Sequence, residues 1–211
     1  GLALWSLGQA GLVIKNAAGT LLAIDPYLSD AIEKTHPGTE FVRRFPPVIP
    51  PQALAVCDAV LISHFHDDHM DMGTLEPLAQ QAPGLPFWIP APDAVTLQRE
   101  NAIVGGQVFA AKTGQEIAVG EFRVLPIAAA HSEYEHDAQG NDRYLGYHIV
   151  CGDLSLWHSG DTLVTPELQT QMCELRPNIT VLPINGGDYA RGARGIMPNM
   201  NFRDAADLHH R

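Results

Sequence analysis

Cysteine is scarce in this chain of 211 residues, which contains three, at positions 57, 151 and 173. No two of them have the close spacing of a metal-binding or redox pair, and an odd, sparse set does not build a disulfide framework. Such usage is typical of a reducing compartment, so we expect a cytoplasmic protein. Each cysteine is expected to act as a small buried apolar side chain.

Positive charge is scarce as well. Lysine and arginine together number 13 against 24 aspartates and glutamates, which gives a formal net charge of −11. This balance argues against a nucleic-acid-binding function, because the phosphate backbone requires a basic surface. Bound divalent cations would offset part of the acidity. We expect a small-molecule partner, and both an anionic substrate and a homo-oligomer are compatible with the sequence.

Long apolar runs, repeats and low-complexity tracts are also missing. No stretch approaches the roughly 18 apolar residues that a membrane-spanning helix requires, and we expect no secretory signal peptide. The chain opens without methionine inside a strand-like segment, so a few N-terminal residues are expected to be missing. Hydrophobic residues make up 45% of the sequence, which is enough for one globular domain with a sizeable core.

Histidine and aspartate, by contrast, are concentrated in the segment HFHDDH at residues 64–69. The preceding apolar run, residues 59–62, is typical of a buried strand, so the segment lies where a strand ends and the chain turns. Open α/β folds build ligand sites at such strand ends. Imidazole and carboxylate together suit Zn, Mn or Fe. One short loop of this composition can therefore supply ligands to two neighbouring metal ions.

Strand-like runs alternate with helical patterns along the rest of the chain. Strands are predicted at residues 4–7, 11–14, 20–25, 59–63, 87–90, 107–111, 116–119, 122–128, 144–150, 155–158 and 180–183. Helices are predicted at residues 73–81, at 93–100 with Asp93 as N-cap, at 166–174 and from residue 201 onward. The proline-rich residues 27–52 are expected to form a long irregular insertion with one short helix. The pattern favours stacked sheets flanked by helices.

The HxHxDH pattern after an apolar strand resembles the signature of the metallo-β-lactamase superfamily of metal-dependent hydrolases. Further stretches are similar to its L-ascorbate-6-phosphate lactonase branch: WSLGQAG at residues 5–11, HFHDDHMD at 64–71, WHSGDT at 157–162, and the NGG and RGAR stretches within 180–200. The likeness covers essentially the whole chain. It implies an α/β (α+β) fold, a four-layer αββα sandwich, in a single domain of residues 1–211.

The same resemblance implies two divalent metal ions per chain, Zn or Mn, with Fe also compatible. Its expected ligands are His64, His66 and His131 for the first ion, Asp68 and His69 for the second, and Asp161 as the bridge. Asp25 is expected to orient the ligand loop from behind. Two cations about 3.5–4 Å apart share a water, lower its pKa and present hydroxide to an electrophile. Asp68 is the expected catalytic residue, which orients this hydroxide or passes a proton to the leaving group.

The superfamily closes its metal site with a late histidine that follows one more strand, and this sequence ends before such a strand. We therefore expect a domain that is incomplete at the C-terminus. His209 and His210 are expected to be helix residues and not ligands. Arg191 and Arg194, in a glycine-rich segment, are candidates for binding an anionic group of the substrate, with a solvated, mobile loop as the alternative. The pair Arg43 and Arg44 is a second choice for the same role.

Three functions remain in contention. The favoured one is a lactonase or carboxylic-ester hydrolase in which a hydroxide activated by two metals opens a small lactone or ester, a sugar-phosphate lactone included. The alternatives are a metal-dependent phosphodiesterase and a non-catalytic metal-binding module on the same fold. A phosphodiesterase for membrane lipids would need an exposed apolar patch, which the sequence does not indicate. The intact histidine motif together with Asp161 argues against a non-catalytic module.

Overall fold

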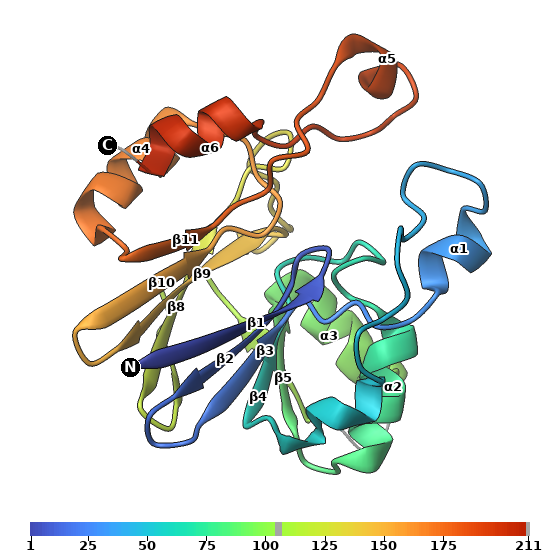
Figure 1. The fold of residues 1–211 in the computed structure, drawn as a ribbon, viewed down its shortest axis with the longest axis vertical. Helices are drawn as coiled ribbons and strands as arrows, with labels where there is room; N and C mark the ends of the chain where they lie inside the picture. The colour runs from blue at the N-terminus through green and yellow to red at the C-terminus, as the bar shows by residue number, and fades with distance from the viewer. Residues whose placement is uncertain (104–106, 210–211) are drawn as a thin grey trace. The chain divides into compact units, whose positions relative to one another are not determined.

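The computed structural model describes residues 1–103 and 107–209, in which strands and helices alternate (Figure 1). The strands are β1 (Leu2–Gly8), β2 (Gly11–Asn16), β3 (Leu21–Ile24), β4 (Ala59–Leu61), β5 (Pro86–Pro90), β6 (Gln107–Ala111), β7 (Ile117–Val119), β8 (Phe122–Ala128), β9 (Leu145–Cys151), β10 (Leu154–His158) and β11 (Ile179–Val181). The helices are α1 (Ala31–Thr35), the 3-10 helix η1 (Pro51–Val56), α2 (Met72–Gln81), α3 (Ala91–Glu100), α4 (Pro166–Leu175), α5 (Tyr189–Gly192) and α6 (Phe202–His209). No helix in the described ranges is long and apolar enough to cross a membrane.

The chain forms two compact units, and the first contains residues 1–111 and 119–121. Its six strands lie in the order β1-β2-β3-β4-β5-β6. The first three strands are antiparallel, whereas β3, β4, β5 and β6 are parallel neighbours. The crossovers between the parallel strands carry the helices, of which α2 and α3 are seen beside this sheet in Figure 1. The parallel strands therefore end at a common edge of the sheet, where loops can build a site.

Apolar side chains between this sheet and its helices form the core of the first unit. Val60 and Ile62 of the run at β4 pack in one buried cluster with Phe87 of β5 and with Leu75 and Leu78 of α2. All of these side chains have no exposed surface. Strands covered in this way are apolar without alternation, which explains the continuous run before the histidine motif. The core thus fixes the position at which β4 ends.

The second unit contains residues 112–118 and 122–211, with a five-stranded sheet in the order β11-β10-β9-β8-β7. Strands β8, β9 and β10 are antiparallel, and β11 joins β10 in parallel. Helix α4, which connects β10 to β11, begins at Thr165, whose hydroxyl accepts a hydrogen bond from the Leu168 N–H. Trp157 packs with side chains of α4 and α6 in the core of this unit.

A buried carboxylate ties the proline-rich insertion to the end of the histidine segment. Asp71 accepts hydrogen bonds from the backbone N–H groups of Leu28 and Ser29 and from the hydroxyls of Ser29 and Thr74. Its side chain is 1% exposed. Because charge-assisted hydrogen bonds of this kind are strong, the first residues of the insertion are held against the loop that follows β4.

The predicted strands and long helices are confirmed, and the mixed α/β class with two sheets is confirmed with them. The predicted N-cap at Asp93 is wrong, because α3 begins at Ala91. Prolines 90 and 92 start this helix, since a fixed φ and a missing N–H cost nothing in a first turn. The sequence patterns did not predict η1 and α5. His209 ends α6 as expected, and His210 lies outside the described residues.

The expectation that each cysteine is buried is confirmed only in part. Cys57 is buried, and desolvation raises the pKa of its thiol to about 12, which leaves it inert. Cys173 lies exposed on α4, so the expectation of a buried side chain is wrong there. All three cysteines, which lie in the described part of the chain, are free thiols.

His148 couples the stability of the second unit to pH. It lies on β9 with 7% of its surface exposed, and its Nε2 makes no hydrogen bond to any described residue. Burial disfavours the imidazolium and lowers the pKa of His148 below its ordinary value of 6.5. The unfolded chain therefore binds this proton more readily than the folded chain. Its contribution to stability is full above the ordinary pKa and is lost as the pH falls below it.

We predict that His148→Leu weakens this pH dependence. Urea unfolding between about pH 8 and 5 should show a steeper loss of unfolding free energy below about pH 6.5 in the wild type than in the variant. His36→Leu, at the exposed residue after α1, is the matched control and should keep the wild-type slope. Parallel curves for the wild type and His148→Leu would contradict the assignment.

Candidate metal centre

The histidine segment and Asp25 meet at one edge of the first sheet. Asp25 directly follows β3, and residues 63–69 follow β4, which is the parallel neighbour of β3. The Asp25 N–H donates to the carbonyl of Leu61 at 3.0 Å, which continues the pairing of these strands. Asp25 then turns the chain with a φ of 44°, a left-handed conformation that aspartate tolerates better than most residues.

The Asp25 carboxylate organises this edge. Its Oδ1 accepts a hydrogen bond from the Ser63 N–H at 2.7 Å, and its Oδ2 accepts one from the Ser63 hydroxyl at 2.6 Å. The same Oδ2 lies 2.8 Å from Nδ1 of His69, and the side chain of Asp25 is completely buried. The carboxylate therefore holds the start of the loop and the orientation of one imidazole together.

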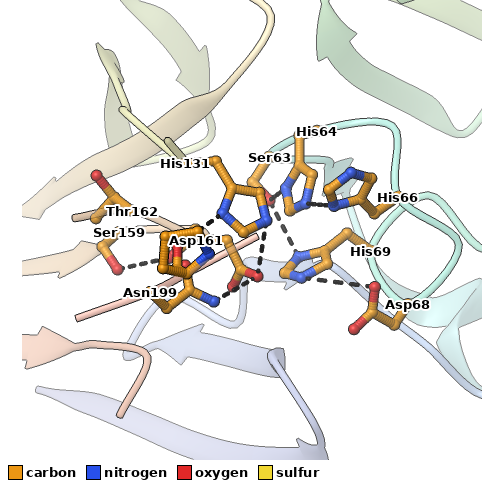
Figure 2. A network of polar contacts seen from close by, with 12 residues as sticks. Ser63, His64, His66, Asp68, His69, His131, Ser159, Asp161, Thr162 and Asn199 are labelled. Atoms are coloured by element: carbon orange, nitrogen blue, oxygen red, sulfur yellow. Dashed lines mark hydrogen bonds and ion pairs between the residues drawn. The ribbon is translucent and has the colours of Figure 1, made fainter. Parts of the chain in front are cut away.

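Ser63 was not identified from the sequence, although it connects two predicted residues. Its Oγ lies 2.9 Å from Nδ1 of His64 (Figure 2). The Ser63 hydroxyl also donates to Asp25. His64 is thus linked through Ser63 to the same carboxylate that holds His69. The only available signal was a small polar residue between an apolar strand and the motif, which is too common to single it out.

The other residues of the segment lie close to these two imidazoles. His66 Nδ1 is 3.0 Å from His64 Nε2, and the Phe65 ring stands edge-on to the His66 ring at a centroid distance of 4.7 Å. The Asp68 Oδ1 lies 4.0 Å from Nε2 of His69. The side chain of Asp68 is 38% exposed, whereas His64 and His69 are buried. The first unit therefore brings all four of its predicted ligands together, with Asp68 on the solvent side.

His131 and Asp161 form the corresponding pair in the second unit. His131 is 3% exposed, its Nδ1 lies 3.2 Å from the carbonyl oxygen of Pro198, and its Nε2 lies 3.5 Å from Oδ2 of Asp161. The side-chain amide of Asn199 donates to that same oxygen at 2.8 Å (Figure 2). Nothing in the sequence pattern marks Asn199, because it comes from the segment before α6.

Thr162 connects the three loops that carry His131, Asp161 and Asn199. Its hydroxyl accepts a hydrogen bond from the Ala130 N–H at 3.1 Å, next to His131 in the chain. Its carbonyl accepts a hydrogen bond from the Met200 N–H at 3.0 Å, next to Asn199. The residues on either side of the pair are therefore fixed through the backbone as well as through side chains.

A glycine in the neighbouring strand allows the turn before Asp161 to pack closely. A Cβ atom at Gly146 of β9 would lie 2.9 Å from the carbonyl oxygen of Ser159 and 3.0 Å from that of His158. Real side chains do not approach backbone atoms so closely, so only glycine fits there. This close approach positions the turn that precedes Asp161.

The two arginines predicted to bind an anion lie in the loop around α5. Arg191 Nη1 donates to the carbonyls of Asn185 and Gly186 at 2.8 and 3.3 Å, and Arg194 Nε donates to the carbonyl of Ala190 at 3.2 Å. Both guanidinium groups therefore help to shape their own loop. Their binding of a substrate anion stays a prediction.

The donor set fits a divalent metal ion. In the first unit the imidazoles of His64, His66 and His69 offer nitrogen donors, and in the second unit His131 and Asp161 offer a nitrogen and a carboxylate oxygen. In His64, His69 and His131, Nδ1 lies within hydrogen-bond distance of an oxygen atom, which makes Nε2 the nitrogen that would bind a metal ion. This arrangement is how metal-binding histidines are oriented in proteins. Imidazole with carboxylate suits Zn, Mn and Fe.

Comparison with known proteins gives a family and several relatives. The model of the family described as "Beta-lactamase superfamily domain" matches residues 22–211. A UPF0173 metal-dependent hydrolase of Myxococcus xanthus is 26% identical over 191 residues, which cover 88% of this chain and 61% of the relative. A probable L-ascorbate-6-phosphate lactonase UlaG of Escherichia coli is 24% identical over 235 residues, covering 96% of this chain and 64% of the relative. The chain therefore spans less than two thirds of the length of these curated relatives.

Solved structures show the same fold. A possible metal-dependent hydrolase from Veillonella parvula is similar with a TM-score of 0.72 at 16% identity, over 99% of this chain and 80% of that one. The isothiocyanate hydrolase from Delia radicum gut bacteria has a TM-score of 0.70 at 22% identity, over 97% of this chain and 78% of that one. With the family match over residues 22–211, these findings show that the chain belongs to the beta-lactamase superfamily domain family and has the metallo-β-lactamase fold.

Proposed function

We propose that this chain carries the catalytic centre of a metal-dependent hydrolase that opens a small lactone or ester. The observation that carries the proposal is the shared orientation of three buried histidines, His64, His69 and His131. In each of them an oxygen atom lies within hydrogen-bond distance of Nδ1, so that Nε2 would be the metal-binding nitrogen. Buried imidazoles held in this way are poorly explained as core residues, because apolar side chains would fill the same space without polar partners.

We propose further that the ligands of the two units serve one shared centre of two cations. His64, His66 and His131 would hold the first ion, Asp68 and His69 the second, and Asp161 would bridge them. When bound, two such cations lower the pKa of a shared water and polarise a carbonyl group. A carboxylate suits the bridge because it has two oxygen acceptors. Zn and Mn are the proposed metals, and Fe also accepts this donor set.

The chain's own residues would perform the remaining steps. Asp68 would accept a proton from the attacking water and return it to the leaving oxygen, and its partial exposure supports this role. Asn199 holds one oxygen of Asp161 and so fixes the direction of the other. Asp25 and Ser63 keep the imidazoles of His64 and His69 from rotating as charge develops. A preorganised site of this kind spends no energy on reorientation during the reaction.

The substrate class is inferred from two relatives. One is named a probable L-ascorbate-6-phosphate lactonase and the other an isothiocyanate hydrolase. Lactones and isothiocyanates both contain an electrophilic carbon. We propose a carbon electrophile for this chain too, with a small lactone, including a sugar-phosphate lactone, as the first candidate. A cytoplasmic location and a small-molecule substrate belong to the same proposal.

We predict that Asp161→Ala lowers metal content and hydrolysis together. Loss of the bridging carboxylate should reduce about two metal ions per chain to one or fewer and should cut lactone hydrolysis by more than about 100-fold. Elemental mass spectrometry and a lactone assay on the same preparation measure both. Asp153→Ala, at the exposed turn between β9 and β10, is the control and should change neither. Wild-type metal occupancy in Asp161→Ala would rule out the bridge.

We predict that Asp25→Asn weakens metal binding without removing a ligand. The amide cannot accept hydrogen bonds from Ser63 and His69 at both positions, so the affinity should fall by about 10–100-fold. Competition with a chelator measures this affinity. Asp58→Asn is a close control, because Asp58 accepts a backbone hydrogen bond from Leu21 just before β4 begins. Equal losses in both variants would assign Asp25 a general structural role.

We predict that substrates with an electrophilic carbon are hydrolysed in preference to phosphodiesters. Parallel assays with a panel of lactones and with bis(p-nitrophenyl) phosphate compare the kcat/KM values of the two classes. The lactones should be favoured by at least about tenfold, which corresponds to about 1.4 kcal/mol of transition-state stabilisation. Preference for the phosphodiester would establish the alternative chemistry, and no hydrolysis of either by metal-loaded protein would favour a binding module.

A further inference from the structure

Arg43 connects residues 36–50, the second half of the insertion, to Tyr27 at the start of the insertion. Its guanidinium carbon lies 4.2 Å from the centroid of the Tyr27 ring, and its Nη2 donates a hydrogen bond to the Tyr27 carbonyl. Tyr27 is fully buried and stands two residues after Asp25, the carboxylate behind the histidine segment. The arginine is therefore placed at the edge of the sheet where Asp25 and the histidine segment lie.

The charge of Arg43 has no counterpart in the described parts of the chain. Its Nε and Nη1 are shielded from solvent, and neither makes a hydrogen bond to a described residue. The nearby carboxylate of Asp71 is occupied by the backbone and hydroxyl groups of Leu28, Ser29 and Thr74. A shielded cation without an anion is costly, because burial removes its hydration and nothing replaces it.

The Phe45 ring and the Arg43 guanidinium both lie near Gly8 of the first hairpin. The Phe45 ring lies against Gly8, so closely that a Cβ atom at Gly8 would be 2.7 Å from it and 3.6 Å from Nη1 of Arg43. Gly8 has a φ of 88°, which a side chain would strain, so the hairpin turn leaves this space open. Phe45 itself is 47% exposed. A side chain with half of its surface in solvent can rotate away without disturbing the core.

We propose that Arg43 is a binding residue for a small oxyanion, a phosphate or a carboxylate, which reaches the guanidinium when the Phe45 ring turns aside. Guanidinium groups bind both anions through several N–H donors, and stacking on Tyr27 holds this one in a fixed plane. The anion would supply the missing counter-charge. Its identification as a group of the substrate rests on the function proposed above, whereas anion binding itself does not.

Arg43 suits this role better than the arginines of the α5 loop. Arg191 gives hydrogen bonds from Nη1 to two carbonyls of its own loop, so part of its donor capacity is already used. Arg43 spends one nitrogen on the Tyr27 carbonyl and keeps two without a described partner. The neighbouring Arg44 is exposed and offers a matched comparison of the same residue type in the same segment.

The test is calorimetric titration of the full chain with inorganic phosphate at low salt. Arg43→Met should weaken phosphate binding by at least tenfold, whereas Arg44→Met should change it by less than twofold. Arg43→Gln is the second variant, because it removes the charge but keeps a polar side chain with N–H donors; it should show the same loss. Equal phosphate affinity in the wild type and both Arg43 variants, or no binding by the wild type, would overturn the proposal.

A second arm separates this site from the metal centre. In the double variant His64→Ala, His66→Ala, phosphate bound at Arg43 should persist. If this variant loses phosphate and Arg43→Gln keeps it, the anion binds at the metals, and the Arg43 proposal fails while the hydrolase proposal stands. If the phosphate site is present but metal-loaded protein hydrolyses no lactone, the Arg43 site stands and the hydrolase proposal fails.

A kinetic arm identifies the source of the anion. If it belongs to the substrate, Arg43→Gln should raise KM for a phosphorylated lactone at least fivefold and leave KM for a neutral lactone unchanged. If it is free phosphate, KM should be unchanged for both while the calorimetric loss remains. A kcat that falls equally for both substrates, with phosphate affinity unchanged, would overturn the proposal.

Discussion

The Asp25 carboxylate is the constraint on which the first half of the candidate centre depends. A completely buried carboxylate must have hydrogen-bond donors, and the donors here are the backbone and hydroxyl of Ser63 and the imidazole of His69. Each donor belongs to the loop after β4. Satisfying the charge of Asp25 therefore also fixes the loop in the conformation that presents His64 and His69. The same hydrogen bonds thus satisfy a buried carboxylate and orient the candidate ligands.

In the second unit, neutral polar groups hold the two candidate ligands in place. The His131 ring is held by the backbone carbonyl of Pro198, and Asp161 is held by the amide of Asn199. Both partners come from the segment just before α6, which Thr162 fixes through Met200. The packing of α6 into the core with Trp157 thus supports the pair from a distance.

Local signals in the sequence predicted much of the fold and part of the site. Apolar runs such as residues 59–62 identified the strands, because strands covered on both faces carry no polar alternation. The histidine segment was identified from composition alone. Asp25, His131 and Asp161 could be selected only through the family resemblance, since each is a single residue at a strand end.

The remaining features of the fold and of the site could not be predicted from the sequence, because they depend on contacts between segments that are distant along the chain. Ser63, Asn199 and Thr162 have common residue types and acquire their roles from partners far along the chain. The start of α3 was misplaced because two prolines outweighed the capping preference of Asp93. The missing counter-charge of Arg43 is likewise a property of the folded chain, because nothing in the pair Arg43-Arg44 distinguishes one residue from the other.

The separation of these partners along the chain has a consequence for how the protein acquires its metal. Asp25 is 38 residues from Ser63 and 44 from His69, and His131 is 67 residues from Pro198. The loops that join them must close before the imidazoles are oriented, and closing such loops is slow because the entropy is lost before the contacts form. In a nascent chain the histidines would therefore bind metal only weakly. The proposed centre would gain its affinity with the completed crossovers, so a metal would be captured late in folding and would then reinforce a structure that is already in place.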